Sequence, residues 1–356
     1  MTLLSHSAVP CTTPLDLAAD PALQGIAEKN VLDLLALAIL HEPAQAALVV
    51  YDTRCELNLM LTRAYRSALP QARFIDFDSV EADTVLAQFA QLAARDLVVL
   101  IQSTSFRLEA FRIRIELFKR GLKVIEHVHL ARMPGIQGRH YIDSLAYDPA
   151  YYHGVGLALK QRIDGASGAI VDSGNGARLV YASRFESAKL NIGDYRTMNN
   201  VGGQFPIGEV FTEAQDLEAV NGRVRIFVFG DTAFMVNRPE QPLTLVIEQG
   251  RITQVIDSTP EFDAMLAIIR AHEGEVWVRE LGFGMNRAFS RDKTVDDIGT
   301  FERMCGIHLS LGAKHGVYAK PQFKRKDARY HVDIFAVTEA VYLDEALVYR
   351  DGAWQV

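Results

Sequence analysis

The feature that most constrains the fold is an alternation of short apolar runs with amphipathic segments over the first 160 residues. Residues 46–52 form a continuous apolar run that ends in an acid, which is typical of a buried parallel strand. Further strands are expected at 73–78, 96–101 and 123–129, and a helix at 106–120 that ends at Gly121. Strands separated by helices of this length predict a parallel, doubly wound sheet. No G-x-G-x-x-G follows the first strand, so we interpret this part as a scaffold rather than a nucleotide-binding site.

After about residue 160 the pattern changes to short β-branched or aromatic runs separated by glycine. Such runs occur at 169–172, 178–181, 224–229 and 243–247, and residues 249–256 follow as the return strand of a hairpin that turns at Gly250. A helical pattern returns at 261–272. We therefore predict two domains: an α/β (Rossmann-like) scaffold domain with a parallel sheet over residues 1–160, and an α+β metal-binding domain with a largely antiparallel sheet over residues 161–356.

Charge, hydropathy and cysteine content exclude several classes of protein. The 356-residue chain has 37 basic and 44 acidic residues, and the net charge of −7 argues against nucleic acid or an anionic membrane as the main partner. It has no run of about 18 apolar residues, and its start lacks the pattern of a signal peptide. Three widely separated cysteines, Cys11, Cys55 and Cys305, fit a reducing compartment. We expect a cytoplasmic protein.

Imidazole and carboxylate groups occur in four segments of the second half. His331 and Asp333 are two apart in a predicted strand, so they point to one face, about 6.5 to 7 Å apart along the backbone. His308, Glu280 and Glu209 lie in three other short segments, each within two residues of a glycine. Two histidines with three carboxylates suit zinc, cobalt or manganese better than calcium. A single histidine in a strand is more often a hydrogen-bonded core or surface residue, so each residue alone is a weak signal.

These segments also carry a resemblance to a known family. The four segments occur in order, as GEVFT at 208–212, ELGFGMN at 280–286, GIHLSLG at 306–312 and HVD at 331–333. Together, over the chain from about residue 165, they resemble the aminopeptidase T and aminopeptidase S family of metallopeptidases. The first half is similar to that family only in its α/β pattern.

The resemblance implies a site with two divalent metal ions. Glu209 and Asp333 would bind one ion, His308 and His331 the other, and Glu280 would bridge them, with Asp333 able to reach both. Two cations about 3.5 to 4 Å apart would lower the pKa of a shared water and polarise the scissile carbonyl. The family is commonly dimeric, which implies a homodimer.

The chain departs from the family pattern at two places. His315 stands where the family has a tyrosine, and Tyr318 follows three residues later; either can supply a proton or stabilise an oxyanion, and a solvated loop histidine is the alternative for His315. The segment 320–329 contains five basic residues, which can steer an anionic substrate or form a solvated hairpin loop.

Three functions are compatible with these residues. The leading prediction is a metallohydrolase that cleaves an amide or peptide bond in a small molecule or short peptide. The second is a dihydroxypyridine dioxygenase-like enzyme, because those dioxygenases resemble distant relatives on the same scaffold and one ferrous ion would bind to His308, His331 and Asp333. Such a site would not need Glu209 or Glu280, which argues against it. The third is a binding protein with a degenerate site.

Overall fold

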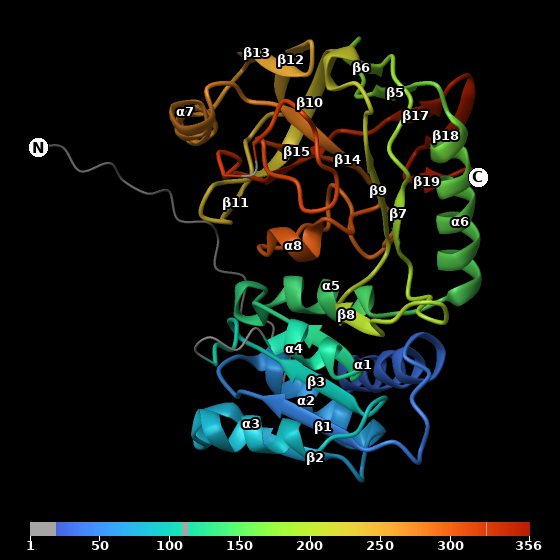
Figure 1. Ribbon diagram of the computed structural model, residues 1–356, viewed down its shortest axis with the longest axis vertical. Coiled ribbons are helices and arrows are strands. Elements are labelled where there is room, and N and C mark those ends of the chain that lie inside the picture. The colour runs from blue at the N-terminus through green and yellow to red at the C-terminus, as the bar shows by residue number, and fades with distance from the viewer. Residues whose placement is uncertain (1–18, 109–112, 325) are drawn as a thin grey trace, which may run out of the picture.

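The computed structural model describes residues 19–108, 113–324 and 326–356, which form two sheets stacked along the long axis of the molecule (Figure 1). A parallel sheet with helices occupies one end, and a curled antiparallel sheet of 14 strands occupies the other. The predicted fold class is therefore confirmed. Cys55 and Cys305 are free thiols, while Cys11 lies outside the described residues.

The first sheet has five strands in the order β2-β1-β3-β4-β8, and all pairings are parallel. Four of them match the predicted runs: β1 (Ala47–Tyr51), β2 (Arg73–Asp76), β3 (Leu97–Ile101) and β4 (Lys123–His127). The fifth, β8 (Gly202–Gln204), comes from the second half of the chain and pairs with β4.

Helices cover both faces of the parallel sheet because its central strands are apolar on both sides. Val49 of β1 belongs to the core formed with one group of helices, whereas Leu48 and Val50 belong to a second core on the opposite face. The first group is α1 (Pro21–Asp33), α2 (Glu56–Ala68) and α5 (Ile136–Ser144), and the second is α3 (Ala82–Ala90) and α4 (Ile113–Lys119). The helix predicted at 106–120 is shorter than expected, since residues 106–108 are not helical and 109–112 lie outside the described residues.

The helix α6 (Pro149–Gly165) leads from the first sheet to the second, and the expected boundary near residue 160 falls inside it. Asp148 caps its start by accepting a hydrogen bond from the Tyr151 amide, and Pro149 occupies the first helical position. The helix packs against β7 (Lys189–Asn191) and β9 (Glu209–Glu213) of the antiparallel sheet.

The antiparallel sheet runs β19-β18-β17-β5-β6-β10-β16-β15-β14-β9-β7, with β11 and β12 also paired to β10, and β13 to β12. The helix α7 (Pro260–Glu273) follows the β12–β13 hairpin, which turns at Gln249 and Gly250 with φ of 48° and 74°, as the glycine predicts. The remaining strands are β5 (Ala169–Asp172), β6 (Arg178–Tyr181), β10 (Val220–Gly230), β11 (Val236–Asn237), β12 (Leu243–Glu248), β13 (Arg251–Ile256), β14 (Val278–Gly284), β15 (Gly306–Leu311), β16 (Val332–Ala336), β17 (Ala340–Leu343), β18 (Ala346–Arg350) and β19 (Ala353–Trp354).

The short helix α8 (Ile298–Phe301) lies on the side of the antiparallel sheet that faces the parallel one (Figure 1). Asp297 begins it and accepts a hydrogen bond from the Thr300 amide. The other oxygen of Asp297, Oδ1, lies 2.9 Å from His129 Nδ1 and 3.2 Å from Arg132 Nη1, both in the chain that follows β4. This buried carboxylate therefore joins the two layers.

Among the described helices, none has the length and apolar character needed to cross a membrane.

Candidate metal centre

Four neighbouring strands of the antiparallel sheet, in the order β16-β15-β14-β9, each contribute one predicted ligand. Glu209 begins β9 opposite Gly284 of β14, and His308 of β15 lies opposite Gly282. Asp333 of β16 lies opposite Ser310, which is two residues from His308. Since residues paired across strands share a face, the side chains of Glu209, Glu280, His308 and Asp333 point to the same side.

Three of these side chains form a compact buried cluster. Each of Glu209, Glu280 and His308 offers one ligand atom, and these atoms lie within 4.8 Å of one another. His308 Nε2 lies 3.2 Å from Glu209 Oε1 and 3.3 Å from Glu280 Oε1. An imidazole nitrogen with two carboxylate oxygens fits a divalent ion of the zinc or manganese type, because both donor types are among their ordinary ligands.

The backbone of β14 is shaped to hold this cluster. A Cβ at Gly282 would lie 2.0 Å from His308 Cε1, so only a glycine lets the imidazole rest against the strand. The register between β14 and β15 shifts between Val278 and Leu281, which places a β-bulge at Glu280. The Glu280 amide donates to Ser310 Oγ at 3.0 Å, so the bulged backbone is hydrogen-bonded.

His331 and Asp333 lie beside each other but outside the three-residue cluster found among the described residues. His331 immediately precedes β16, and its Nε2 lies 3.1 Å from Asp333 Oδ1. Its other nitrogen, Nδ1, donates to the Lys314 carbonyl at 3.2 Å. These two predicted ligands therefore contact each other.

His315 approaches Glu280 from the loop after β15. Its Nδ1 accepts hydrogen bonds from the amides of Val317 at 3.1 Å and Tyr318 at 3.2 Å, so the neutral ring carries its proton on Nε2. That nitrogen lies 2.9 Å from Glu280 Oε2, and the His315 side chain is only 2% exposed. Glu280 thus presents Oε1 to His308 and Oε2 to His315, and His315 is not a solvated loop residue.

The Tyr318 hydroxyl donates to the Ser187 carbonyl at 2.8 Å and to the Phe211 carbonyl at 3.3 Å, rather than to a member of the cluster. Burial raises the pKa of Tyr318 above its ordinary value. In the structure the phenol anchors the loop to the chain that precedes β7.

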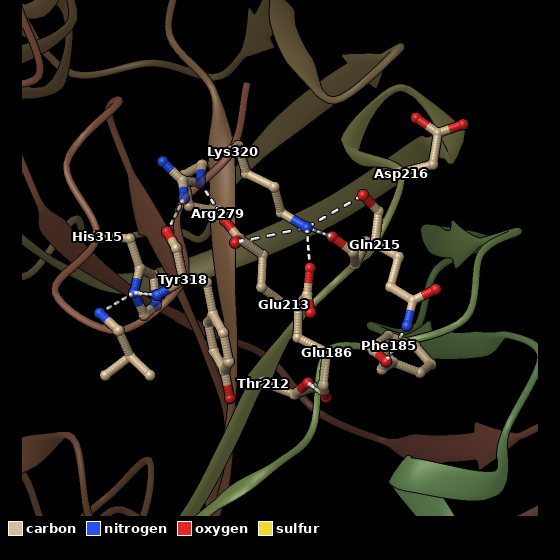
Figure 2. A network of polar contacts seen from close by, with 12 residues as sticks. Phe185, Glu186, Thr212, Glu213, Gln215, Asp216, Arg279, His315, Tyr318 and Lys320 are labelled. Carbon is tan, nitrogen blue, oxygen red and sulfur yellow. Dashed lines mark hydrogen bonds and ion pairs between the residues drawn. The ribbon is translucent and has the colours of Figure 1, made fainter. Parts of the chain in front are cut away.

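A buried polar network fixes the same loop (Figure 2). Arg279 pairs with Glu213 and donates to the carbonyls of Ala313 and, at 3.0 Å, Tyr318. Lys320 Nζ donates to Glu186 Oε1 at 2.6 Å and to the carbonyls of residues 214 and 215 at 2.7 and 3.0 Å. The loop between Ala313 and Lys320 is therefore anchored at both ends by buried hydrogen bonds.

One of the five basic residues at 320–329 belongs to this buried network and is not exposed to a substrate. Lys320 is buried and paired, whereas Lys324, Lys326 and Arg329 are exposed. Arg325 lies outside the described residues.

The cluster has strongly perturbed acid and base groups. Burial alone would raise the pKa of Glu280, but His308 and His315 lower it below its usual range. Burial opposes a charged His308, yet its contacts with Glu209 and Glu280 raise its pKa well above the ordinary value. For His331, burial is outweighed by Asp333, and the pKa rises to about 10.

Two charged residues next to the cluster are not predicted from the sequence. Arg303 Nη1 lies 2.9 Å from Glu209 Oε2 and 2.5 Å from Glu302 Oε2. Burial and the nearby Asp333 raise the pKa of Glu302 well above its usual range. The only signal in the sequence is a pair of charges between the apolar residues Phe301 and Met304, which does not indicate a partner.

Neither a protein-family model nor a curated protein sequence matches this chain. Solved structures do match it. The 2,5-dihydroxypyridine dioxygenase of Pseudomonas putida KT2440 is similar with a TM-score of 0.59 and 16% identity, over 94% of this chain and 96% of that one. Wild-type AmpT of Thermus thermophilus, an aminopeptidase, has a TM-score of 0.56 and 12% identity, over 94% of this chain and all of that one (100%).

At these identities the similarity shows a shared fold, and both neighbours are enzymes. The resemblance seen in the sequence therefore holds at the level of the fold. The site residues of this chain have to be interpreted from their own geometry.

Proposed function

We propose that this protein is a metal-dependent hydrolase that cleaves an amide or peptide bond at the cluster of Glu209, Glu280 and His308. The observation that carries the proposal is the convergence of these three buried ligand atoms within 4.8 Å, from three adjacent strands. Buried acids and an imidazole in such proximity are costly unless they hold a cation or a proton.

The bound ion would polarise the substrate carbonyl and lower the pKa of a coordinated water. Glu280 and His315 supply the proton chemistry in this proposal. Glu280 Oε1 belongs to the ligand cluster, while Oε2 lies 2.9 Å from His315 Nε2 and can take up a proton from the attacking water. Glu280 then passes this proton to the leaving nitrogen, His315 stabilises negative charge through its Nε2–H, and Tyr318 holds the loop that presents His315.

The donor set favours hydrolysis over the dioxygenase alternative. Mononuclear iron oxygenases use two histidines and one carboxylate, whereas the cluster here contains one histidine and two carboxylates. The predicted iron ligands His331 and Asp333 contact each other rather than joining His308 in that cluster. We therefore propose zinc, cobalt or manganese, with ferrous iron as the second candidate because a structural neighbour is a dioxygenase.

The substrate is proposed to be a short peptide or small amide, with preference for an anionic group. Lys324, Lys326 and Arg329 are exposed on the segment before β16 and can attract negative charge. A cytoplasmic location is proposed from the three widely separated cysteines, the absence of nucleic-acid and membrane partners from the net charge, and a homodimer from the resemblance.

The test is a matched activity screen on one metal-stripped preparation. Samples reloaded with zinc, cobalt, manganese or ferrous iron are assayed on aminoacyl amides and dipeptides, including acidic ones, and on 2,5-dihydroxypyridine with oxygen uptake. We expect amide hydrolysis that Glu280→Gln removes and that the exposed Glu218→Gln control retains. Ring cleavage with iron alone would identify a dioxygenase, and metal binding without any turnover would indicate a binding protein.

A further inference from the structure

Arg303 occupies a buried position against the ligand cluster. It follows α8, is 8% exposed as a residue, and has Glu209 and Glu302 on the same nitrogen, Nη1, at 2.9 and 2.5 Å. A guanidinium cannot lose its proton under ordinary conditions, so this positive charge is permanent.

The two oxygens of Glu209 are divided between two partners. Oε1 faces His308 Nε2 at 3.2 Å, on the side of the three-residue cluster. Oε2 faces the Arg303 guanidinium at 2.9 Å. A second ion on Glu209 would need this second oxygen, because the first belongs to the cluster.

The other predicted ligands of a second ion, His331 and Asp333, would have to hold it without Glu209, whose second oxygen is paired with Arg303. Asp333 is the residue expected to share the second ion with Glu209, and its Oδ1 lies 3.1 Å from His331 Nε2. A second divalent ion would also lie close to the Arg303 charge in a buried region, where repulsion between cations is strong.

We propose that Arg303 takes the place of a second metal ion, so that the centre binds one divalent ion, on Glu209, Glu280 and His308. This inference rests on the proposed function only in requiring an ion at those three residues. It departs from the two-ion site that the sequence resemblance implies, and it is independent of which divalent metal is bound.

The test counts metal ions and does not depend on turnover. The full-length chain is stripped with a chelator and titrated with zinc or cobalt chloride; zinc is counted by elemental analysis after desalting, and cobalt by visible absorption. We expect one ion per wild-type chain and two per chain of Arg303→Met, which keeps the side-chain length but removes the charge.

Two control variants isolate the charge. Arg303→Lys retains a positive charge and should keep the count at one. Arg287→Met should also keep it at one, because Arg287 lies over the Tyr151 ring, 4.0 Å from its centre, and is not a partner in the ion pairs of the three ligands. Circular dichroism melts establish that each variant is folded.

Each outcome has a defined meaning. Two ions in the wild type, or one ion in a folded Arg303→Met, would overturn the assignment of Arg303. If Arg303→Met does not fold, the wild-type count still decides, with one ion supporting the inference and two refuting it. A wild-type chain that binds no ion would refute the proposed function itself.

Discussion

His315 reaches Glu280 from a loop rather than from a strand, with Nε2 lying 2.9 Å from Oε2. The loop is held by Arg279, the residue next to Glu280 on β14, through the carbonyls of Ala313 and Tyr318. One strand position therefore carries a ligand, and its neighbour positions the loop that contacts this ligand.

We expect Arg279→Met to lower both stability and turnover. Removing the guanidinium leaves the buried Glu213 with only the more distant Lys320, 3.9 Å away, which should cost about 3–5 kcal/mol in the free energy of unfolding. The double variant Arg279→Met/Glu213→Leu should recover much of that stability but remain about 10–100-fold lower in kcat, because the loop stays unanchored. Urea unfolding and steady-state kinetics measure the two effects, and full kcat in the double variant would argue against a positioning role.

Glu280→Ala should abolish both metal loading and turnover while leaving the chain folded. Glu280 contributes an oxygen to the cluster and contacts both His308 and His315, so its removal takes away a ligand and a proton acceptor together. Elemental analysis, circular dichroism and hydrolysis assays test the variant beside Glu218→Ala, an exposed acid paired with Arg251. Full activity in Glu280→Ala would refute its role.

Gly282→Ala should displace His308 and weaken metal binding. The added Cβ would lie 2.0 Å from the imidazole, and overpacking of this kind costs about 1–3 kcal/mol. We expect a metal Kd at least about tenfold higher, since each 1.4 kcal/mol corresponds to tenfold. Gly154→Ala in α6, where a Cβ meets nothing within 4 Å, is the matched control and should bind normally. Equal Kd values for the two variants would contradict the packing argument.

Metal affinity should fall as the pH falls. Glu209 and Glu280 raise the pKa of His308 well above its ordinary value, so the metal-free site holds a proton on that ring at neutral pH. Binding has to expel this proton, which predicts a Kd for zinc that increases about tenfold for each unit of decrease in pH. Chelator competition at pH 6, 7 and 8 measures the slope. A Kd that does not change with pH would show that His308 is already neutral.

Much of the fold follows from local patterns in the sequence. The continuous apolar runs predict β1 and β3 because both faces of those strands are covered, and Gly250 predicts its hairpin because the turn needs positive φ. Strand β8 has no such signal, since Gly-Gly-Gln lacks β-branched and aromatic residues and pairs only through its backbone.

The site was only partly predictable for a related reason. Glu209, Glu280 and His308 stand out because each lies within two residues of a glycine, in short segments that occur in the order of the resembled family. The role of Arg303 depends on a contact with Glu209, far away in the sequence, and charge pairs of that kind leave no periodic pattern. The hydrogen bonds by which Arg279 and Lys320 hold the loop are equally unpredictable, because in the sequence each is an ordinary basic residue.

The bond between His129 and Asp297 ties the chemistry of the centre to the arrangement of the two layers. Asp297 begins α8, and α8 leads directly to Arg303, so the guanidinium is mechanically connected to the parallel sheet. A change in the relative position of the two layers would therefore move α8 and, with it, the Arg303 charge beside Glu209.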